Sequence, residues 1–466
     1  MSTVNKNLPD PLPLKKLIGP SFIILGMGLG SGELILWPYL SVNFGLGIIW
    51  AAVLGITLQF FINMEIERYT LATGESIFAG LKRKYGIFMP YWFIVTTLIP
   101  WIWPGITASA ATVLAKSIGI EYSRTIGIIL LFGIGIIYGL GNIVYKTQET
   151  VQKAIILIGV PFVLLITFVS AKAKDWLSLA QGLVGKGENY WFLPEALPWA
   201  IFLSALAFAG AGGNLNLAQS LYVKEKGYGM AANSGNITNV LKSKSASIKI
   251  EGDPFVQTTK NIKRFRIWWK RINIEHFIVF WATGAFTMIM LSLLAYSTVY
   301  GTSQVNAGIS FVIKEAEQIS RLANPMFGMF FLVIVGIMLF GTQFSVYGSN
   351  ARIASENLVL CNKKIFKTRN MSKYFYTFLW IQIISGIIIF LLGFAEPLFL
   401  VTISGILNAF AMFTYTGLIL YMNKTVLPNS AKPNLFRTVA VSFAFLFYGA
   451  FSLFTIYRYL AHYITK

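Results

Sequence analysis

One carboxylate stands inside a hydrophobic segment that is otherwise free of charge. Glu33 ends a run of poor helix formers that begins at Gly26 and includes Gly28, Gly30 and Ser31. A carboxyl group costs about 2.5 kcal/mol or more at the centre of a bilayer, so Glu33 is expected to face a cavity or a partner. There it could bind a cation or carry a proton, which is the chemistry needed to exchange one for the other. The alternative is a carboxyl that only holds neighbouring backbone amides.

A second run of flexible and polar residues lies near the middle of a later hydrophobic segment. It comprises Gly210, Ala211, Gly212, Gly213, Asn214 and Asn216. Together with Gly28 and Gly32 of the first segment, these glycines predict that both helices are interrupted. Unwound backbone at this depth must be buried or line a wet cavity, where its freed carbonyls can coordinate a cation. The alternative is that the small residues only let neighbouring helices pack closely.

Composition indicates the class of protein that holds these residues. Of the 466 residues, 56% are hydrophobic and 12% are charged, whereas soluble domains carry about 25% charged residues. Stretches long enough to cross about 30 Å of hydrocarbon recur along the whole chain. We therefore expect an all-α integral membrane protein of about eleven transmembrane helices. The expected ranges are 18–42, 45–69, 87–115, 125–145, 151–170, 196–222, 274–300, 325–350, 374–393, 397–422 and 437–461.

The distribution of charge predicts an orientation. With eleven crossings, most of the 38 Lys and Arg residues fall on one side of the membrane. The positive-inside rule makes that side cytoplasmic, which predicts a multi-pass protein of the cell membrane with a cytoplasmic N-terminus and an external C-terminus. The net charge of +20 then reflects topology rather than nucleic-acid binding. The lipid bilayer is the expected partner, and the oligomeric state is left open.

The largest basic segment, residues 223–273, is predicted to be a cytoplasmic loop. Its part from 260 to 271 mixes cations with Phe265, Trp268 and Trp269, as an interfacial anchor on anionic lipid would. Residues 227–259 are rich in Gly, Ser, Asn and Lys, which predicts a mobile stretch rather than a second domain. We therefore expect a single transmembrane domain.

The two predicted interruptions lie five helices apart. Secondary transporters built from inverted five-helix repeats place discontinuous helices at equivalent positions of both halves and bind substrate between them. This spacing predicts repeats at about 18–170 and 196–422, an extra helix at about 437–461, and discontinuous helices one and six. Further polar residues expected at such a site are Thr342, Gln343 and Asn408, although each could instead make an interhelical hydrogen bond.

The sequence contains no pattern typical of an enzyme. The glycines of the first helix are not spaced as GxGxxG, and neither a P-loop nor a pair of histidine ligands occurs. Cys361 is the only cysteine, which excludes an internal disulfide. No cofactor is expected other than a transported ion. The remaining ionisable residues of note are expected in solvated, salt-bridged or interfacial positions near helix ends: Glu65, Glu67, Arg68, His276 and His462.

Three short segments resemble the Nramp family of divalent-metal transporters. Gly19-Pro20 enters the first helix, Thr73-Gly74-Glu75 follows the second, and residues 111–119 read ATVLAKSIG, which is similar to the family's A-T-D-L-A-E-x-I-G. The resemblance touches most of the chain. It implies a LeuT-type fold of the APC superfamily, alternating access, and a cation site between helices one and six.

The departures from this family concern its metal and proton sites. Where the family has D-P-G-N in helix one, this chain reads Gly30-Ser31-Gly32-Glu33, and where it has M-P-H in helix six, the chain reads Ala211-Gly212-Gly213. Val113 and Lys116 stand where the family has acidic residues of its proton route. Asn408 takes the place of a helix-ten glutamine. The remaining donors are oxygens, which suit a hard or partly hydrated cation such as Mg²⁺ or Mn²⁺.

We therefore expect a secondary-active transporter of a divalent cation, with Glu33 as metal ligand and H⁺ as a candidate coupling ion. The same fold could carry an amino acid or another small organic solute, because helix breaks also offer helix N-termini to a carboxylate. A non-transporting membrane scaffold is the third alternative. The residues expected to bind the ion or solute are Gly30, Ser31, Glu33, Ala211, Asn214, Asn216, Gln343 and Asn408.

Overall fold

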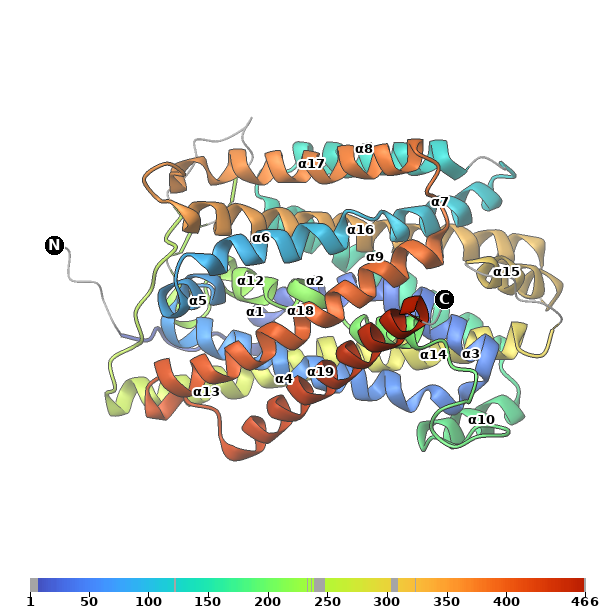
Figure 1. Cartoon of the computed structure of the whole chain (residues 1–466), viewed down its shortest axis with the longest axis horizontal. Coiled ribbons are helices and arrows are strands. Elements are labelled where there is room, and N and C mark those ends of the chain that lie inside the picture. Colours follow the sequence, from blue (N-terminus) through green and yellow to red (C-terminus); the bar gives the residue numbers. More distant parts are fainter. Residues whose placement is uncertain are drawn as a thin grey trace.

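The long apolar segments form helices in the computed structural model, because backbone that spans a bilayer must satisfy its hydrogen bonds within each segment. The structure describes residues 7–120, 123–232, 234, 235, 237, 238, 248–302, 309–322 and 324–464, with side chains up to residue 457. Most long helices run side by side, so that the molecule is elongated along their direction (Figure 1).

Ten helical stretches among the described residues are long and apolar enough to cross a membrane. The sixth expected helix is not one of them, because it forms two shorter halves; counted together, these make an eleventh crossing. Numbered along the chain, the crossings are α2, η1 and α3 (Pro20–Gly28, Leu29–Leu36, Trp37–Phe44); α4 (Trp50–Thr73); α6 and α7 (Phe88–Trp101, Gly105–Ser117); α8 (Ser123–Leu140); α9 (Val144–Ser170); α11 and α12 (Trp199–Ala207, Ala218–Lys226); α13, η5 and α14 (Thr259–His276, Phe277–Ala282, Thr283–Val299); α16 (Pro325–Cys361); α17 (Met371–Leu391); α18 (Pro397–Val426); and α19 (Leu435–Ile464).

Crossing 6 is interrupted where the sequence predicted. Its first half ends at Ala207, residues 208–212 are not helical, and a short turn of 3₁₀ helix, η3 (Gly213–Leu215), precedes α12. Gly210, Gly212 and Gly213 all have positive φ, a backbone conformation that favours glycine. The prediction of a discontinuous sixth helix is therefore confirmed.

Crossing 1 is also irregular at the predicted place, but its form differs from the unwound backbone that we expected. Residues Leu29–Leu36 form a π-helix between two α-helices, so the crossing stays helical from Pro20 to Phe44. The wider π-helical turn still pairs backbone N–H and C=O groups within the segment. The glycines therefore change the helical geometry without freeing the carbonyls.

Crossing 3 contains an interruption that we did not predict. Its two halves, α6 and α7, are separated by Ile102, Trp103 and Pro104. Pro104 lacks a backbone N–H, and Pro100 already weakens the last turn of α6. The sequence WIWPG at 101–105 carries this signal.

The basic segment 223–273 is largely ordered in its described parts. Residues 223–226 end α12, and residues 259–273 belong to α13, which is the first part of crossing 7 and continues without a gap into η5 and α14. Ile250, Gly252 and Phe255 of the connecting chain are buried against other elements. Our prediction of a mobile stretch over 227–259 was wrong for these residues, because their apolar side chains pack against the bundle; part of that range lies outside the described residues.

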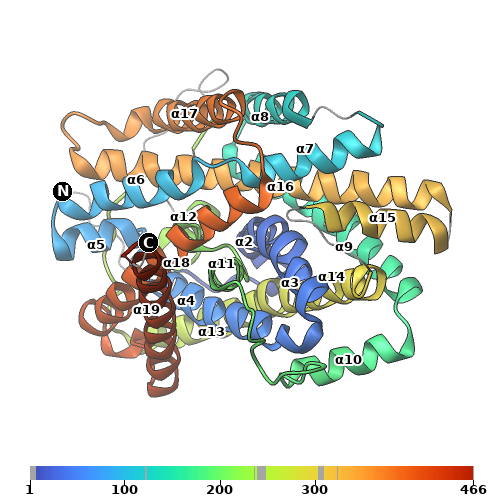
Figure 2. The ribbon, with the colours of Figure 1, turned by 45° about the vertical axis from the view of Figure 1, so that its right-hand side comes forward.

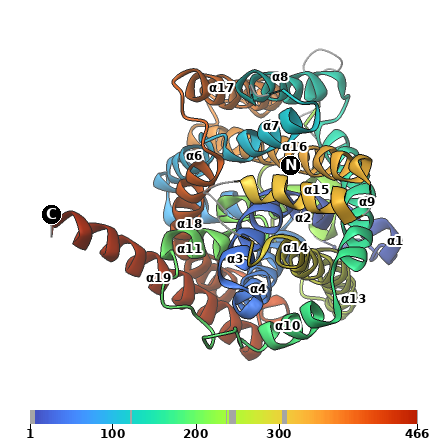
Figure 3. The same cartoon turned by 90° about the vertical axis from the view of Figure 1, so that its right-hand side faces the viewer.

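Two short helices lie at one end of the bundle, and α13 lies toward the other. Figure 1 and Figure 2 show α10 (Ala173–Leu183) and α15 (Ser310–Leu322) at one end and α5 (Ile77–Tyr85) at the other. The helices α8 and α17 pack together on one flank, whereas the far end of α19 points away from the bundle (Figure 3). The predicted repeat boundaries stay a prediction.

Candidate functional site

The two glycine runs lie against each other in the middle of the bundle. A Cβ atom at Gly28 would come within 2.8 Å of the backbone of Gly210, and one at Gly32 would overlap the carbonyl oxygen of Phe208. Because these two glycines are four residues apart, they lie on one face of crossing 1. That face therefore packs directly on the interruption of crossing 6.

The side chain of Glu33 points away from crossing 6, toward α14. It is fully buried, and Thr287 of α14 donates a hydrogen bond from Oγ1 to Glu33 Oε2. Glu33 follows Gly32 directly along the helix, so its side chain is turned away from the glycine face. Its carboxyl group therefore lies between crossings 1 and 7, whereas the family resemblance implied a cation site between helices one and six.

The surroundings of Glu33 are rich in hydrogen-bond acceptors. The single hydroxyl hydrogen of Thr287 is shared among Glu33 Oε2 and the carbonyl oxygens of Thr283 and Gly284, the latter two both at 3.0 Å. Glu33 Oε1 is buried without a hydrogen-bond partner in the described structure. Buried acceptors in excess of donors are costly unless a cation or an added proton satisfies them.

Ser31 faces a small pocket on a different side of crossing 1. The pocket is lined by Trp101 and Trp103 at the interruption of crossing 3, by Phe208 and by Ser404 of α18, among others. Ser31 Oγ is buried and has no hydrogen-bond partner among the described residues. Crossings 1, 3, 6 and 10 therefore enclose a mixed aromatic and hydroxyl surface.

The two asparagines of crossing 6 bind neighbouring helices rather than crossing 1. Asn214 Nδ2 donates to Thr96 Oγ1 at 2.8 Å and to Thr97 Oγ1 at 2.9 Å. Asn216 Nδ2 donates to the hydroxyl oxygen of Tyr415 at 3.0 Å, and that hydroxyl in turn donates to the carbonyl of Gly213 at 2.9 Å. Both asparagines thus hold the interrupted crossing in place.

Two of the remaining predicted residues lie beside the irregular part of crossing 1 or the interruption of crossing 6. A Cβ atom at Gly30 would lie 2.7 Å from the side chain of Thr342, whose Oγ1 donates to the carbonyl of Gly26 at 2.8 Å. Asn408 lies directly over Gly213, with its Oδ1 unpartnered. Gln343 is buried with an unpartnered Nε2, and Ala211 is fully buried.

Several residues at this site were not predicted from the sequence. Gln59 of α4 supports the interruption of crossing 6: its Nε2 donates to the carbonyl of Ala207 at 2.9 Å, and its Oε1 accepts from the N–H of Gly212 at 3.3 Å. Thr287 was missed because a threonine in an apolar helix is common. Trp101 and Trp103 lie between Pro100 and Pro104 and could have been found from these helix-breaking residues.

Some ionisable residues are more deeply buried than expected. Glu67 and His276 were expected in solvated, salt-bridged or interfacial positions, yet their side chains are at most 1% exposed. Glu65 and Arg68 do form the expected salt bridge, at 2.8 Å, inside the protein. His462 lies outside the residues whose side chains are described.

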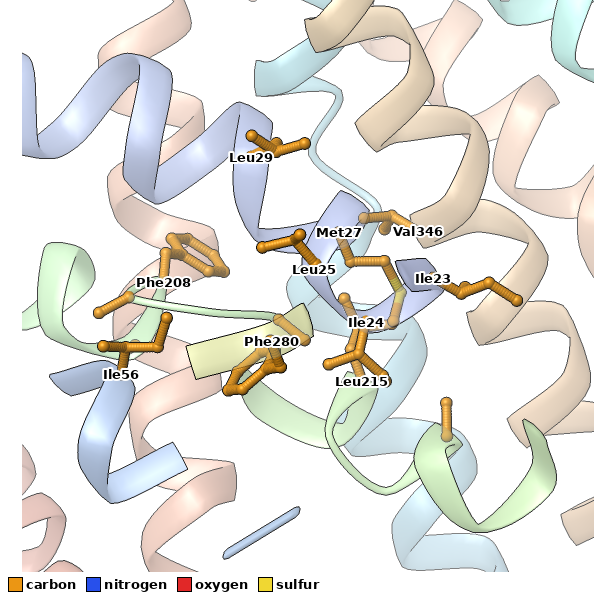
Figure 4. Packing of buried hydrophobic residues seen from close by; sticks show 14 of the residues in the cluster. Ile23, Ile24, Leu25, Met27, Leu29, Ile56, Phe208, Leu215, Phe280 and Val346 are labelled. Carbon is orange, nitrogen blue, oxygen red and sulfur yellow. The ribbon is translucent and has the colours of Figure 1, made fainter. Parts of the chain in front are cut away.

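Apolar side chains fill much of the space around crossing 1. Figure 4 shows Leu25 and Leu29 of crossing 1 among Ile56, Phe208 and Phe280 from three other segments. Within the described ranges, no three His, Cys, Asp or Glu side chains gather so that they could hold a metal ion. A cation near Glu33 would therefore be bound by one carboxylate together with neutral oxygens.

Solved structures of known proteins resemble this chain. No family model matches the chain, and no curated relative matches it. A variant of the manganese transporter of Eremococcus coleocola superposes with a TM-score of 0.73 at 11% identity, covering 100% of this chain and 92% of that one. The same transporter in complex with an aromatic bis-isothiourea compound gives a TM-score of 0.70 at 12% identity, with coverage of 98% and 90%.

A second kind of transporter shares the architecture more distantly. Mhp1, a nucleobase-cation-symport-1 family transporter, has a TM-score of 0.54 at 14% identity, covering 96% of this chain and 94% of that one, in a closed conformation with bromovinylhydantoin bound. Identities this low show the fold alone. The chain is thus an all-α membrane protein with the LeuT-type transporter fold, in which an interrupted crossing 6 packs on a π-helical crossing 1.

Proposed function

We propose that this protein is a secondary-active transporter that carries a divalent cation across a membrane by alternating access, with Glu33 as a ligand of the cation. The observation that carries the proposal is the fully buried carboxyl of Glu33, whose Oε1 is unpartnered within an acceptor-rich site. It lies in the π-helical part of crossing 1, which packs on the interruption of crossing 6. A scaffold would have no need of these features.

The donor set favours a hard cation. Glu33 and Thr287 Oγ1, which are in hydrogen-bond contact, would both be oxygen ligands. Mg²⁺ and Mn²⁺ prefer such ligands and tolerate sites that retain part of their hydration. The substrate would accordingly be Mg²⁺, Mn²⁺ or a similar ion. The likeness to the manganese transporter and the sequence motifs support a divergent, Nramp-related origin.

The charge distribution supports a location in the cell membrane. The basic segments on the side of α13 would face the cytoplasm by the positive-inside rule, which places the N-terminus inside. The C-terminus would then lie outside after eleven crossings.

Purified protein in liposomes tests the cation hypothesis. Influx of Mg²⁺, Mn²⁺ and Ca²⁺ is followed with indicator dyes, for the wild-type protein, for Glu33→Gln and for Glu315→Gln. Glu315 is a buried carboxyl of α15, at one end of the bundle, and serves as a matched control. We expect Glu33→Gln to abolish flux while Glu315→Gln retains it. Normal flux in Glu33→Gln, or no cation flux in the wild-type protein, would contradict the proposal.

A second candidate function is transport of a small organic solute, and the composition of the closely packed surface beside Ser31 favours it. Aromatic rings from Trp101, Trp103 and Phe208 stand next to the hydroxyl groups of Ser31 and Ser404. Such a surface suits a ligand with an apolar body and a few polar groups. Uptake of labelled amino acids and nucleobases by the same liposomes separates the two candidates. Uptake without cation dependence would favour the second.

A further inference from the structure

A buried cluster of ionisable side chains lies apart from Glu33. Ser21 Oγ of α2 lies 2.6 Å from Glu275 Oε2 and 2.8 Å from His276 Nδ1 of α13. Ser21 and His276 are fully buried, and Glu275 is 6% exposed. His276 and Thr287 are eleven residues, or about three helical turns, apart on one continuous crossing. The cluster is therefore distinct from the Glu33 site.

These side chains have unused hydrogen-bonding capacity. Glu275 Oε1 and His276 Nε2 are buried without a partner in the described structure. A second carboxyl, Glu67 of α4, is near enough to Glu275 to interact with it electrostatically. Gln219 Nε2 donates to Glu67 Oε1 at 2.5 Å, while Glu67 Oε2 is unpartnered. Polar atoms left without a partner in a protein interior require an explanation, such as a bound ion, an ordered water or a functional role.

The positively charged side chains near the cluster form ion pairs with other carboxylates. Lys153 and Lys226 interact electrostatically with Glu275, but both bind Glu149, at 2.7 Å and 3.0 Å. Arg437 lies on the side of His276 but pairs with Glu65 at 3.6 Å. No ion pair to Glu67 or Glu275 occurs among the described residues. The charged or titratable groups that face the cluster are Glu67, Lys153, Lys226, Arg437, Tyr145 and Tyr228.

We propose that Ser21, Glu275 and His276 form a proton-binding relay that takes up and releases the ion coupled to transport. A proton suits the cluster better than a metal ion. Ser21 already links Glu275 to His276 by hydrogen bonds, and the described residues contain no group of three His, Cys, Asp or Glu side chains that could hold a metal ion. One added proton also makes the Glu275–His276 pair electrically neutral, which a buried site favours.

One proton can pass between His276 and Glu275 through the hydroxyl group of Ser21. When Ser21 donates its hydroxyl hydrogen to Glu275 Oε2, His276 Nδ1 must be the donor to Ser21 Oγ. From the imidazolium and carboxylate state, the Nδ1–H bond breaks as Ser21 Oγ gains that proton, and the Ser21 O–H bond breaks as Glu275 Oε2 gains the serine's proton. The products are a neutral imidazole and a carboxylic acid, with no other reactant.

The cluster also lies close to the interruption of crossing 6. The ring of His276 stacks on Phe280 with centroids 4.7 Å apart, and a Cβ atom at Gly210 would lie 2.9 Å from Phe280 Cζ. Phe280 belongs to the π-helix η5, which begins directly after His276, and short π-helical stretches recur at functional sites. One aromatic ring thus separates the relay from the interruption of crossing 6.

Nuclear magnetic resonance of ¹⁵N-labelled histidine tests the relay without requiring transport. The chain has two histidines, so His462→Asn protein reports His276 alone. Between about pH 5 and 8, we expect the His276 ring signals to change with pH in this background, and to stay those of a neutral imidazole when Glu275→Gln is added. Ser21→Ala should change the titration, whereas Ser297→Ala, which removes a hydroxyl bonded within α14 at 2.7 Å, should not. An unchanging His276 signal, or the same titration in Glu275→Gln, would overturn the relay.

Proton flux tests the link to the proposed transport function, on which this part of the inference rests. In proteoliposomes, we expect cation entry to move protons in the wild-type protein and to continue without proton movement in Glu275→Gln. Cation flux without proton flux in the wild-type protein would refute the coupling role. If no cation moves at all, the proposed function fails, while the histidine signals still decide whether the relay exists.

Discussion

The hydroxyl group of Thr287 donates a hydrogen bond to the carboxyl group of Glu33, and this contact joins crossing 7 to the π-helical part of crossing 1. Thr287 therefore both orients the carboxyl and supplies a further oxygen ligand. The acidic and neutral oxygens of the proposed cation site come from two helices rather than from one loop.

Replacing Thr287 with valine should weaken cation binding. Valine keeps the shape of the side chain but removes the oxygen beside Glu33, so we expect the Kd for Mn²⁺ or Mg²⁺ to rise about tenfold, or about 1.4 kcal/mol. Isothermal titration calorimetry measures the change. Thr298→Val on the same helix is the control, because Thr298 Oγ1 donates to the carbonyl of Leu294 at 2.7 Å. Equal affinities in both variants would remove Thr287 from the site.

Replacing Gly32 with alanine should disturb the packing of crossing 1 on crossing 6. The new methyl group would overlap the carbonyl oxygen of Phe208, which is backbone and cannot move freely. Overpacking of this kind costs about 1–3 kcal/mol, so thermal unfolding in detergent should occur at lower temperature and transport should fall. Gly133→Ala meets no atom nearer than 3.9 Å and should unfold no earlier than the wild-type protein. A Gly32→Ala protein as stable as Gly133→Ala would contradict the observed packing.

Removing Arg352 should destabilise the protein more than removing a cation on the surface. Arg352 Nε binds Glu225 Oε1 at 2.8 Å, and both side chains are nearly inaccessible. Arg352→Met leaves the charge of Glu225 buried and unpaired, which costs about 3–5 kcal/mol, and Arg352→Met with Glu225→Gln should recover part of that loss. Lys363→Met, which breaks an exposed pair with Glu251, should change stability by at most about 1 kcal/mol. Thermal unfolding of the four proteins compares them.

Glu315 should make stability depend on pH. Burial raises the pKa of this carboxyl well above its ordinary value. The folded protein therefore binds a proton more tightly than the unfolded chain, so the stability from Glu315 is complete below its unfolded pKa of about 4.3 and is lost as pH rises toward the folded pKa. Glu315→Gln should unfold at a higher temperature than the wild-type protein at neutral pH, with the difference shrinking as pH falls. A difference independent of pH would show that Glu315 does not titrate in this way.

The sequence alone determined the membrane class, the approximate positions of the crossings and the interruption of crossing 6. These properties depend on local composition, because hydropathy and the conformational freedom of glycine act within one segment. The π-helix of crossing 1 was visible from the sequence as an irregularity near Gly28–Glu33, but not in its form. The interruption of crossing 3 could have been predicted from Pro100 and Pro104.

Only the tertiary structure decided which way each residue of crossing 1 faces. Gly28 and Gly32 fit against backbone, and this packing sets the rotation of the helix and turns Glu33 toward Thr287, a partner 254 positions away. Ser21 and Glu275 meet across the same separation. No local pattern encodes such pairs, because a buried polar group is satisfied by whichever helix the packing of small residues brings beside it.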